Sequence, residues 1–375
     1  MLDFAREYAD IGPEILAATE AVFKSQRFVL GPEVRAFEEA AARHCRVAEA
    51  IGCGSGTDAL WLAMAAAGVE PGDRVLTTAF SFFATASSIL RLGATPLLAD
   101  IDPRSFNLHP ASVSQAFKKH PATRAILPVH LYGQCADWTA LKTAAASHAC
   151  LLIEDAAQAF GALWDGVPAG ALGMAAAFSF YPTKNLSAAG EAGMVTTNSA
   201  AIARRVGSLR SHGMEIRYHH EEVGWNSRMD TLQAAILLVK LRHVDVWNER
   251  RRALAARYNE LFHAAGIVDP GPYPDRGIVL PWVDPRAHHV YHQYVIRVAR
   301  RAELRSWLHD RGIGSEIYYP LGLHQQKALT SLGYREGDFP ESERAAREVL
   351  ALPIFPQLLE DEQEQVVAAI RDFLA

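Results

Sequence analysis

Cysteine, lysine and long apolar runs are all scarce in this sequence of 375 residues. Its four cysteines, Cys45, Cys53, Cys135 and Cys150, form no C-x-x-C pair and no zinc-like spacing, which suits a reducing compartment. The sequence has 37 basic and 42 acidic residues, and a net charge of −5 is not typical of a protein that binds nucleic acid. No uncharged run reads as a membrane-spanning helix, and the first residues lack the basic and apolar regions of a secretory signal. We therefore expect a cytoplasmic protein that binds neither membrane nor nucleic acid.

Short apolar runs alternate with helix-sized spacers over the first two thirds of the sequence. This alternation predicts an α/β domain with a mainly parallel sheet. The expected strands are Arg74–Thr78, Ala94–Ala99, Ala125–His130, Cys150–Ile153 and Ala175–Phe180.

The character of the sequence changes after a long helical pattern that begins at Met229. Residues 268–285 contain five prolines, which is typical of a linker. A strand is expected over His289–Val298 and helices over Ala302–Arg311, Glu341–Leu350 and Glu360–Leu374. We therefore predict a large α/β domain over residues 1–250 and a smaller α+β domain over residues 251–375.

A glycine-rich turn, Gly52-Cys53-Gly54-Ser55-Gly56-Thr57, leads into a helix expected over Asp58–Ala67, with Thr57 or Asp58 as its N-cap. Unpaired N–H groups at a helix start bind anions, and glycine lets an anion approach the backbone closely. The turn is not a Rossmann fingerprint, because Thr57 takes the place of the third glycine, and it is not a Walker A loop. Taken alone, the motif leaves both a phosphate site and a structural turn open.

Two adjacent carboxylates, Glu154 and Asp155, end the apolar run that begins at Leu151. Neighbouring residues of a strand point to opposite faces of the sheet. The carboxyl ends of parallel strands are where α/β proteins place ligands. The alternative is that Asp155 caps a short helix over Ala156–Phe160.

Lys184 stands apart from the six other lysines, because it follows 18 uncharged residues in an apolar, aromatic stretch. Desolvation lowers the pKa of a lysine, as a Schiff-base amine requires. A solvated loop lysine is the alternative. An anion loop, a strand-end aspartate and an isolated lysine together are what pyridoxal 5'-phosphate requires. The histidines His288, His289 and His292 point to both faces of their expected strand, so no metal site is predicted.

Five motifs resemble those of the DegT/DnrJ/EryC1/StrS aminotransferases, which have the aspartate aminotransferase fold (fold type I). The similarity extends essentially from end to end, from Phe28-Val29-Leu30-Gly31-Pro32 to Leu352-Pro353. The motifs are Gly54-Ser55-Gly56-Thr57-Asp58-Ala59-Leu60, Pro128-Val129-His130-Leu131-Tyr132-Gly133-Gln134, Glu154-Asp155-Ala156-Ala157-Gln158, Ser179-Phe180-Tyr181-Pro182-Thr183-Lys184-Asn185-Leu186 and Asn226-Ser227-Arg228-Met229-Asp230.

The resemblance implies roles for residues around a bound pyridoxal 5'-phosphate. Lys184 would form the covalent link, Asp155 would pair with the pyridinium nitrogen, and Gln158 would lie near the ring hydroxyl. Phe82 would stack on the ring. The phosphate group would be bound by Gly56, Thr57 and Ser179, with Asn226 from the partner of a homodimer.

The resemblance also implies the substrates. Phe28, Arg228, Tyr318 and His324 would bind substrate, with Arg228 acting across the dimer interface. An amino group, from L-glutamate, would pass to a nucleotide-linked keto-sugar in the synthesis of amino sugars for surface polysaccharide or a glycosylated metabolite. The motif around Tyr181 resembles that of enzymes acting at C3. The alternatives are a 4-keto-sugar aminotransferase, a dehydratase of the same family, and a cofactor-binding regulator without turnover.

Two positions depart from the family pattern. Gly190-Glu191-Ala192-Gly193 takes the place of the Gly-Asp-Gly-Gly found in many members, and Tyr318-Tyr319-Pro320 takes the place of His-Tyr-Pro. Glu191 retains an acid, while Ala192 stiffens a turn that usually contains glycine. Tyr318 changes whichever contact the histidine makes, although a tyrosine hydroxyl still donates a hydrogen bond.

Overall fold

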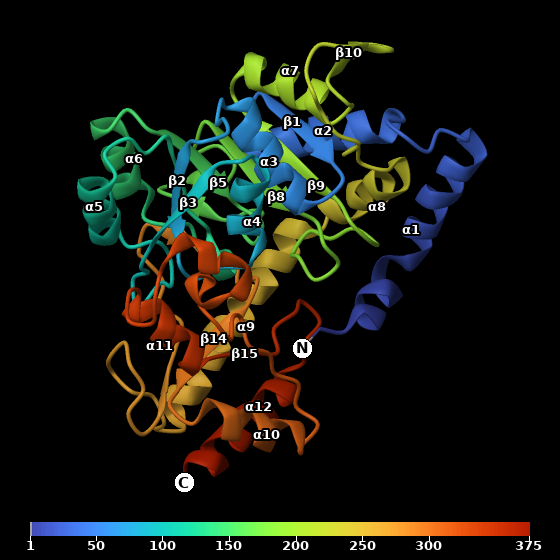
Figure 1. Ribbon diagram of the computed structural model, residues 1–375. Helices are drawn as coiled ribbons and strands as arrows, with labels where there is room; N and C mark the ends of the chain where they lie inside the picture. Colours follow the sequence, from blue (N-terminus) through green and yellow to red (C-terminus); the bar gives the residue numbers. More distant parts are fainter. Residues whose placement is uncertain (1) are drawn as a thin grey trace.

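A seven-stranded sheet covered by helices on both faces forms the centre of the protein (Figure 1), which is described from a computed structural model over residues 2–375. Five neighbouring strands run parallel, and β9 is antiparallel to both of its neighbours. The sheet order is β1 (Glu49–Cys53), β9 (Gly193–Thr197), β8 (Ala175–Ser179), β5 (Leu151–Asp155), β4 (Ala125–Leu127), β2 (Arg74–Thr78) and β3 (Thr95–Ala99). The predicted mainly parallel α/β sheet is confirmed.

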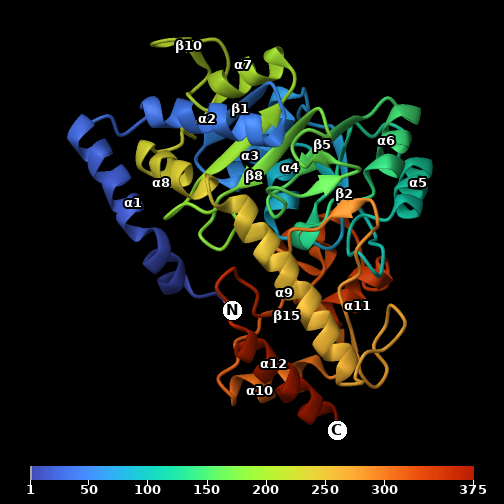
Figure 2. The same cartoon turned by 180° about the vertical axis from the view of Figure 1, so that it is seen from behind.

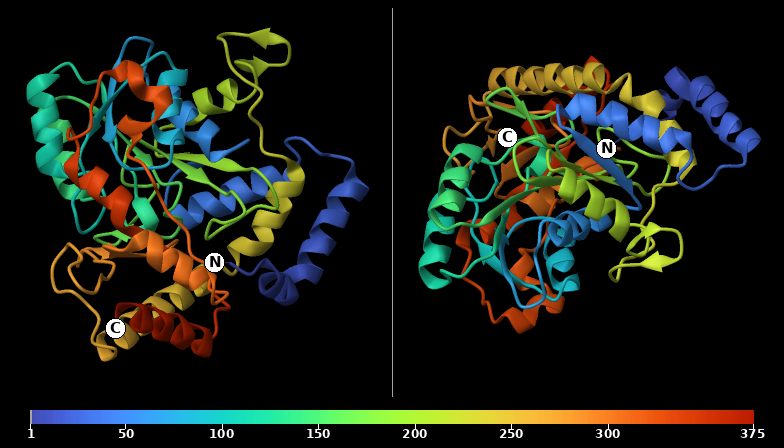
Figure 3. Two further views of the ribbon diagram at one scale, coloured as in Figure 1. Left: turned by 60° about the horizontal axis from the view of Figure 1, so that its bottom comes forward. Right: turned by 90° about the horizontal axis from the view of Figure 1, so that it is seen from above.

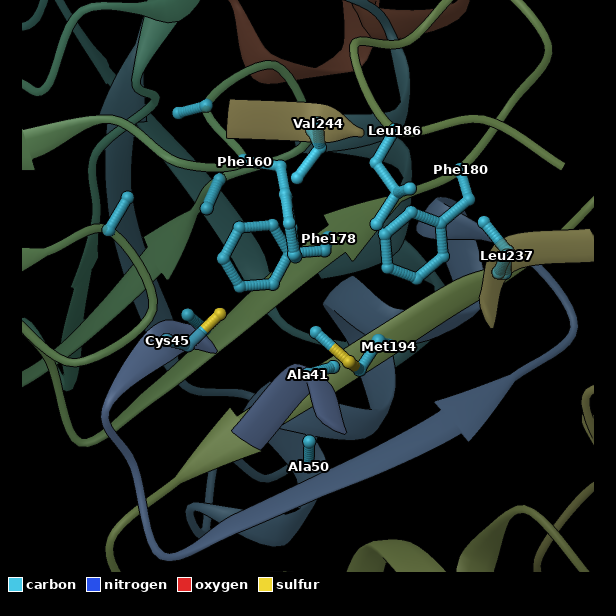
Figure 4. Close-up of a cluster of buried hydrophobic side chains, with 14 of the residues drawn as sticks. Ala41, Cys45, Ala50, Phe160, Phe178, Phe180, Leu186, Met194, Leu237 and Val244 are labelled. Carbon is cyan, nitrogen blue, oxygen red and sulfur yellow. The ribbon is translucent and has the colours of Figure 1, made fainter. Parts of the chain in front are cut away.

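Alternating side chains on the strands divide the core into layers on the two faces of the sheet. On β8, Ala176 and Phe178 join the cluster under α2 (Pro32–Cys45) and α8 (Thr231–Leu241). Figure 4 shows Phe178 there beside Phe160, Phe180 and Met194. Two other residues of β8, Ala175 and Ala177, face the cluster under α3 (Gly56–Ala66) and α7 (Ala200–Leu209). Both faces are therefore buried, as a parallel sheet requires.

The β3 end of the sheet is covered by α5 (Pro110–Lys119) and α6 (Trp138–Ser147), which pack on Leu76, Leu97 and Ile126. Shorter elements connect the layers and complete the large domain. They are α4 (Ala84–Arg91), η1 (Leu131–Gly133), the sheet of β6 (Leu163–Trp164), β7 (Val167–Pro168) and β13 (Ala287–His288), and the hairpin of β10 (Met214–Ile216) and β11 (His219–His220).

A second, smaller domain follows the long helix α9 (Val244–Ala264), which runs from the sheet down to the C-terminal helices (Figure 2). Val244 belongs to the core of the large domain, whereas Tyr258 and Phe262 belong to that of the small domain. The predicted boundary at residue 250 therefore falls inside α9. The small domain contains the sheet β12 (Ile278–Val279), β14 (Tyr294–Val298), β15 (Val349–Leu352) and the helices α10 (Arg301–His309), η2 (Leu323–Gln325), η3 (Lys327–Leu332), α11 (Pro340–Glu348) and α12 (Glu360–Leu374).

The first helix, α1 (Phe4–Ser25), lies at the side of the molecule next to α8 (Figure 3). Its first turn reaches the small domain, where Arg6 pairs with Glu362 at 2.6 Å. Lys240 of α8 pairs with Glu7 at 2.5 Å and donates to the Ser187 hydroxyl at 3.0 Å. The N-terminal helix thus ties the small domain to the segment that follows Lys184.

Two helix predictions are wrong in detail. The pattern that begins at Met229 is not one helix, because the chain turns at Arg242 and His243 between α8 and α9. The helix that follows the glycine-rich turn is capped neither by Thr57 nor by Asp58. Ser55 is the N-cap of α3, and its hydroxyl accepts from the Asp58 N–H at 3.1 Å.

Two expected elements of the small domain are shorter than predicted or divided. The strand expected over His289–Val298 begins at Tyr294, and the stretch Glu341–Leu350 is divided between α11 and β15. The expected helix Glu360–Leu374 is confirmed as α12. Over residues 2–375, none of the helices combines the length and the apolar character that crossing a membrane requires.

Candidate active site

A cavity of about 450 Å³ lies at the edge of the sheet where the parallel strands end. It is formed by the start of α3 and by the segments that follow β2, β5 and β8. This is the position at which open α/β sheets bind ligands. The residues predicted from the sequence that line it are Gly56, Thr57, Phe82, Asp155, Gln158, Ser179 and Lys184.

Lys184 follows β8 in a turn closed by a hydrogen bond from its N–H to the Tyr181 carbonyl at 2.8 Å. Surrounding protein atoms lower the pKa of its amine to about 8, against a weaker opposing effect of the Asp155 carboxylate. At pH 7, about one amine in ten is then neutral, compared with about one in three thousand at an ordinary lysine pKa. The Lys184 side chain is half-buried in the cavity wall, which favours the predicted desolvated lysine over the solvated alternative.

Asp155 is the last residue of β5, and 3% of its surface is exposed. Burial raises the pKa of its carboxyl group, while hydrogen bonds and Lys184 act in the opposite direction. The Thr85 hydroxyl donates to Oδ2 at 2.8 Å, and the Ala157 N–H donates to Oδ1 at 3.3 Å. No helix follows Asp155 between β5 and β6, so the helix-cap alternative is wrong. The carboxylate instead lines the cavity.

Glu154 points to the opposite face of the sheet and is completely buried. Its carboxylate accepts hydrogen bonds from His130 Nε2 at 3.1 Å and from the N–H groups of Gly170, Leu172 and Gly173 at 2.7–3.0 Å. Since four donors already surround it, Glu154 holds the loop before β8 in place. The two adjacent carboxylates thus have separate roles, as the alternation of a strand requires.

The start of α3 forms a cradle that lies against Ser179. A Cβ atom added at Gly56 would come within 2.4 Å of the Ser179 Cβ, so a larger residue would displace Ser179. The first turn of a helix leaves its N–H groups without helical partners, and within residues 2–375 those of Gly56 and Thr57 have no other acceptor. Both residues line the cavity, which supports the anion-binding interpretation of the glycine-rich turn over the purely structural one.

Gln158 and Phe82 form further parts of the wall. The Gln158 side chain accepts from the Tyr132 N–H at 2.7 Å and donates to the Tyr319 hydroxyl at 3.0 Å. These contacts fix the orientation of the amide and leave its second N–H as a donor for a ligand. The Phe82 ring is 57% exposed, and its centroid lies 6.1 Å from that of Tyr319. An exposed ring at a cavity wall is available for stacking.

Asn226, Arg228 and Phe28 lie outside this cavity. Asn226 is exposed and forms an isolated β-bridge with Ser211, and the neighbouring Ser227 hydroxyl accepts from the Gly54 N–H at 3.2 Å. Arg228 is half-buried, and its Nε has no hydrogen-bond partner within the described chain. Phe28 is 37% exposed on the loop between α1 and α2. These three side chains do not reach the site of their own chain.

The two predicted substrate residues of the small domain, Tyr318 and His324, lie in different surroundings. Tyr318 lies beside Tyr319, and the Tyr132 hydroxyl donates to its carbonyl. It borders a second cavity of about 290 Å³ that also contacts Thr183, next to Lys184. His324 is buried, its Nε2 lies 2.9 Å from Glu343 Oε1, and its ring packs on Phe339. Those contacts favour a structural role for His324 in the small domain.

The departure from the family pattern at residues 190–193 fits the local packing. Glu191 lines the cavity, and its neighbour Ala192 is completely buried in the large-domain core. Glycine is required instead at Gly193, where a Cβ atom would lie 2.2 Å from the Ser55 carbonyl oxygen.

Three polar residues of the site were missed by the sequence reasoning: Ser81, Thr85 and Tyr319. Ser81 and Thr85 are buried hydroxyl residues that follow β2, and no local pattern in the sequence marks them. Tyr319 follows the predicted Tyr318 directly. Over residues 2–375 the structure contains no cluster of three or more metal-ligating side chains.

The fold and the cavity place the chain in a known family of enzymes. The sequence model of the DegT/DnrJ/EryC1/StrS aminotransferase family matches residues 9–371, so this chain belongs to that family. The predicted family, fold and class of enzyme are confirmed.

Two relatives align over nearly their whole length. A "Pleiotropic regulatory protein" of Geobacillus stearothermophilus is 48% identical over 373 residues, which cover 100% of this chain and 98% of the relative. A UDP-N-acetyl-3-dehydro-alpha-D-glucosamine 3-aminotransferase of Acidithiobacillus ferrooxidans is 39% identical over 371 residues, 99% of this chain and 96% of that protein.

A solved structure shares the same fold. The crystal structure of DesV from S. venezuelae, in complex with a ketimine intermediate, superposes with a TM-score of 0.93 at 41% identity. The match covers 99% of this chain and 97% of DesV.

Proposed function

We propose that this protein uses pyridoxal 5'-phosphate to transfer the amino group of L-glutamate to a nucleotide-linked 3-keto-sugar in amino-sugar biosynthesis. The observation that carries the proposal is the meeting of Lys184, Asp155 and the α3 cradle in one cavity. Each supplies one of the three groups that the cofactor requires: an amine, an acid and an anion site.

The residues present fit this cofactor. The cradle at Gly56 and Thr57 offers free N–H groups for a phosphate, and it lies against the Ser179 hydroxyl group. Asp155 supplies a carboxylate for a protonated ring nitrogen, and Gln158 has one N–H left for the ring oxygen. The exposed Phe82 ring provides a face for stacking.

When bound, the cofactor supplies a ring that accepts electrons from the carbon that bears the amino group. The side chains of this chain then handle protons. Asp155 would hold a proton at the ring nitrogen through charge attraction, and Lys184 Nζ would move a proton from the donor carbon to the cofactor. A pKa near 8 suits this task, because the amine exchanges protons readily near neutral pH.

The sugar and the position of amination rest on the relatives. The Acidithiobacillus ferrooxidans relative is named for a UDP-linked sugar with a 3-dehydro group. The motif from Tyr181 to Asn185 resembles that of C3 enzymes, and Tyr181 lines the cavity. A 4-keto-sugar remains the alternative substrate. A family dehydratase would typically carry histidine at the position of Lys184.

A regulator without turnover is the second candidate, because the Geobacillus stearothermophilus relative is named as a regulatory protein. We expect the purified protein to be yellow and to be bleached by L-glutamate, with one 2-oxoglutarate formed per site. An aminotransferase then recovers its colour when a UDP- or dTDP-linked 3-keto-sugar is added. A protein that stays yellow with glutamate and releases no 2-oxoglutarate would contradict the proposal.

We further propose that the active site is shared between two subunits. Within residues 2–375, Lys184 is the one cationic side chain that lines the cavity, beside the anionic Asp155 and Glu191. The cofactor phosphate, the glutamate carboxylates and a sugar nucleotide are all anionic, so further positive charge is required. Arg228 of the partner subunit supplies this charge, and Asn226 of the partner subunit adds an uncharged hydrogen-bond donor, in agreement with their position outside the cavity of their own chain.

Mixing inactive subunits should restore activity if the site is shared. Lys184→Ala chains mixed with Asn226→Ala, Arg228→Ala chains should recover about a quarter of wild-type activity, because half of randomly formed dimers contain one intact site of two. Lys184→Ala mixed with Asp155→Asn is the matched control and should recover nothing, since both residues line the same cavity. No recovery in the first mixture, despite demonstrated subunit exchange, would contradict the shared site.

A further inference from the structure

Two buried hydroxyl groups stand in line behind Asp155. The Thr85 hydroxyl lies 2.8 Å from Asp155 Oδ2, and the Ser81 hydroxyl lies 2.8 Å from that of Thr85. Thr85 is 1% exposed and Ser81 is 4% exposed. Thr85 lies in the first turn of α4, and Ser81 lies on the segment that connects β2 to α4 and also carries Phe82.

Counting protons fixes the direction of this array while Asp155 is ionised. A carboxylate only accepts hydrogen bonds, so the single proton of the Thr85 hydroxyl is donated to Asp155. The Thr85 oxygen must then accept, which makes Ser81 the donor of the second bond. Both hydroxyl dipoles therefore point toward the carboxylate, and each strengthens the other.

The array also leaves the two oxygens of Asp155 unequal. Oδ2 accepts from Thr85, whereas within the described residues Oδ1 receives only the long bond from the Ala157 N–H at 3.3 Å. An ionised oxygen has capacity for further donors. Within the cavity, Oδ1 is thus the oxygen with room for the proton of a ring nitrogen.

We propose that Thr85, with Ser81 behind it, is a positioning residue that keeps Asp155 ionised and presents its free oxygen to the cofactor ring. This inference rests on the proposed function, since it needs a ring nitrogen opposite Asp155. Thr85 and Ser81 also join the site to Phe82, because all three residues lie between β2 and the first turn of α4. The same short segment therefore holds the stacking ring and orients the acid.

The array matters because, among residues 2–375, Asp155 has no ion-pair partner in direct contact. Burial acts to protonate the carboxyl group, and the bond from Thr85 is the largest effect that opposes it, ahead of Ala157, Lys184 and His130. Tyr319 of the small domain is neutral, because burial raises the pKa of its hydroxyl. Glu191 and Tyr181 are the other titratable residues that line the same cavity. Removing the Thr85 hydroxyl should therefore move the protonation of Asp155 toward higher pH.

The test compares Thr85→Val, which removes the hydroxyl at nearly constant shape, with Thr85→Ser, which retains it. Holoenzyme is prepared with cofactor labelled with ¹⁵N in the ring, and its nitrogen resonance is followed as the pH is lowered. We expect the pH midpoint for protonation of Asp155, observed through the ring-nitrogen resonance, to rise by about one pH unit in Thr85→Val. The glutamate half-reaction of this variant should slow by about ten- to hundredfold. Thr85→Ser should stay within about threefold of wild type, and cofactor affinity should change little in both variants.

The outcomes separate this inference from the proposed function. If Thr85→Val matches wild type in midpoint and rate while Asp155→Asn is impaired, the positioning role is wrong and the proposed function stands. If Thr85→Ser, which keeps the hydroxyl, is as impaired as Thr85→Val, the presence of the hydroxyl does not decide the outcome and the inference is again overturned. If the wild type binds no cofactor, both fail. Should Thr85→Val not fold, Ser81→Ala takes its place, with a smaller shift in the same direction as the supporting result and no shift as the contradicting one.

Discussion

Lys184→Ala is expected to abolish transamination while cofactor binding is weakened and persists. The substitution removes the amine that moves the proton, and proton transfer by a positioned side chain alone is worth about a hundred- to ten-thousandfold. The cradle at α3, Asp155 and Phe82 remain and still hold the cofactor. The measurement is the rate of the glutamate half-reaction in cofactor-loaded protein, with cofactor affinity measured separately.

The matched control is Lys118→Ala, in the last turn of α5. This variant should retain wild-type rate and colour. The expectation for Lys184 is contradicted if Lys184→Ala retains more than about a hundredth of the wild-type rate at saturating cofactor.

Asp155→Asn is expected to lose far more turnover than cofactor. The charge of Asp155 stabilises a proton on the ring nitrogen, and preorganised electrostatic stabilisation of this kind is worth about 3 kcal/mol or more, which is about a hundredfold or more in rate. Asparagine retains the shape and most of the contacts, so the cofactor should still bind. The measurement compares the glutamate half-reaction rate with the dissociation constant of the cofactor.

Glu154→Gln is the matched control, because it changes the neighbouring carboxylate in the same way. Glu154 accepts four hydrogen bonds in the core, so this variant should lower thermal stability while its folded, loaded fraction keeps a near-normal rate. Near-normal turnover in Asp155→Asn together with lost turnover in loaded Glu154→Gln would show that the wrong carboxylate was assigned.

The cofactor-free protein provides a second distinction between the two carboxylates. The folded-state pKa of Asp155 is raised, so the folded protein loses stability as pH rises above the ordinary carboxyl pKa of 3.8. Asparagine has no such penalty. Cofactor-free Asp155→Asn should therefore unfold at the same temperature as wild type or higher at pH 7, whereas Glu154→Gln should unfold at a lower one.

Local features of the sequence were sufficient to predict much of the site. Lys184 could be found because one lysine in an uncharged, aromatic stretch has few structural explanations. The glycine-rich turn could be found from its closely spaced glycines before a helix. In the structure, Gly56 is required by its contact with Ser179. The choice of Asp155 over Glu154 needed the resemblance to the family. Strand alternation separates the two carboxylates but does not indicate which face of the sheet holds the cavity.

Contacts between distant parts of the chain could not be predicted in this way. Thr85 meets Asp155 across 70 residues of sequence, and Tyr319 meets Gln158 across 161. No local pattern marks these pairs, because each depends on how β2, β5 and the small domain are placed. Residues of that kind become visible only when the fold is known.

The helix errors also have a physical origin in tertiary structure. Arg242 and His243 contain no helix-breaking signal, so an apolar pattern continues through them in the sequence. The chain turns there because α8 packs on α1 and α2, whereas α9 leaves for the small domain. Likewise, Ser55 rather than Thr57 caps α3, because its hydroxyl reaches the free N–H of Asp58.

The most direct test of the account is to locate the covalent attachment of the cofactor. The loaded protein is reduced with borohydride, which fixes the cofactor on the lysine that carries it, then digested, and the labelled peptide is sequenced by mass spectrometry. The account predicts one label per chain, on Lys184, and none in Lys184→Ala. Label on any of the other six lysines, or a wild-type protein that takes up no label, would contradict it.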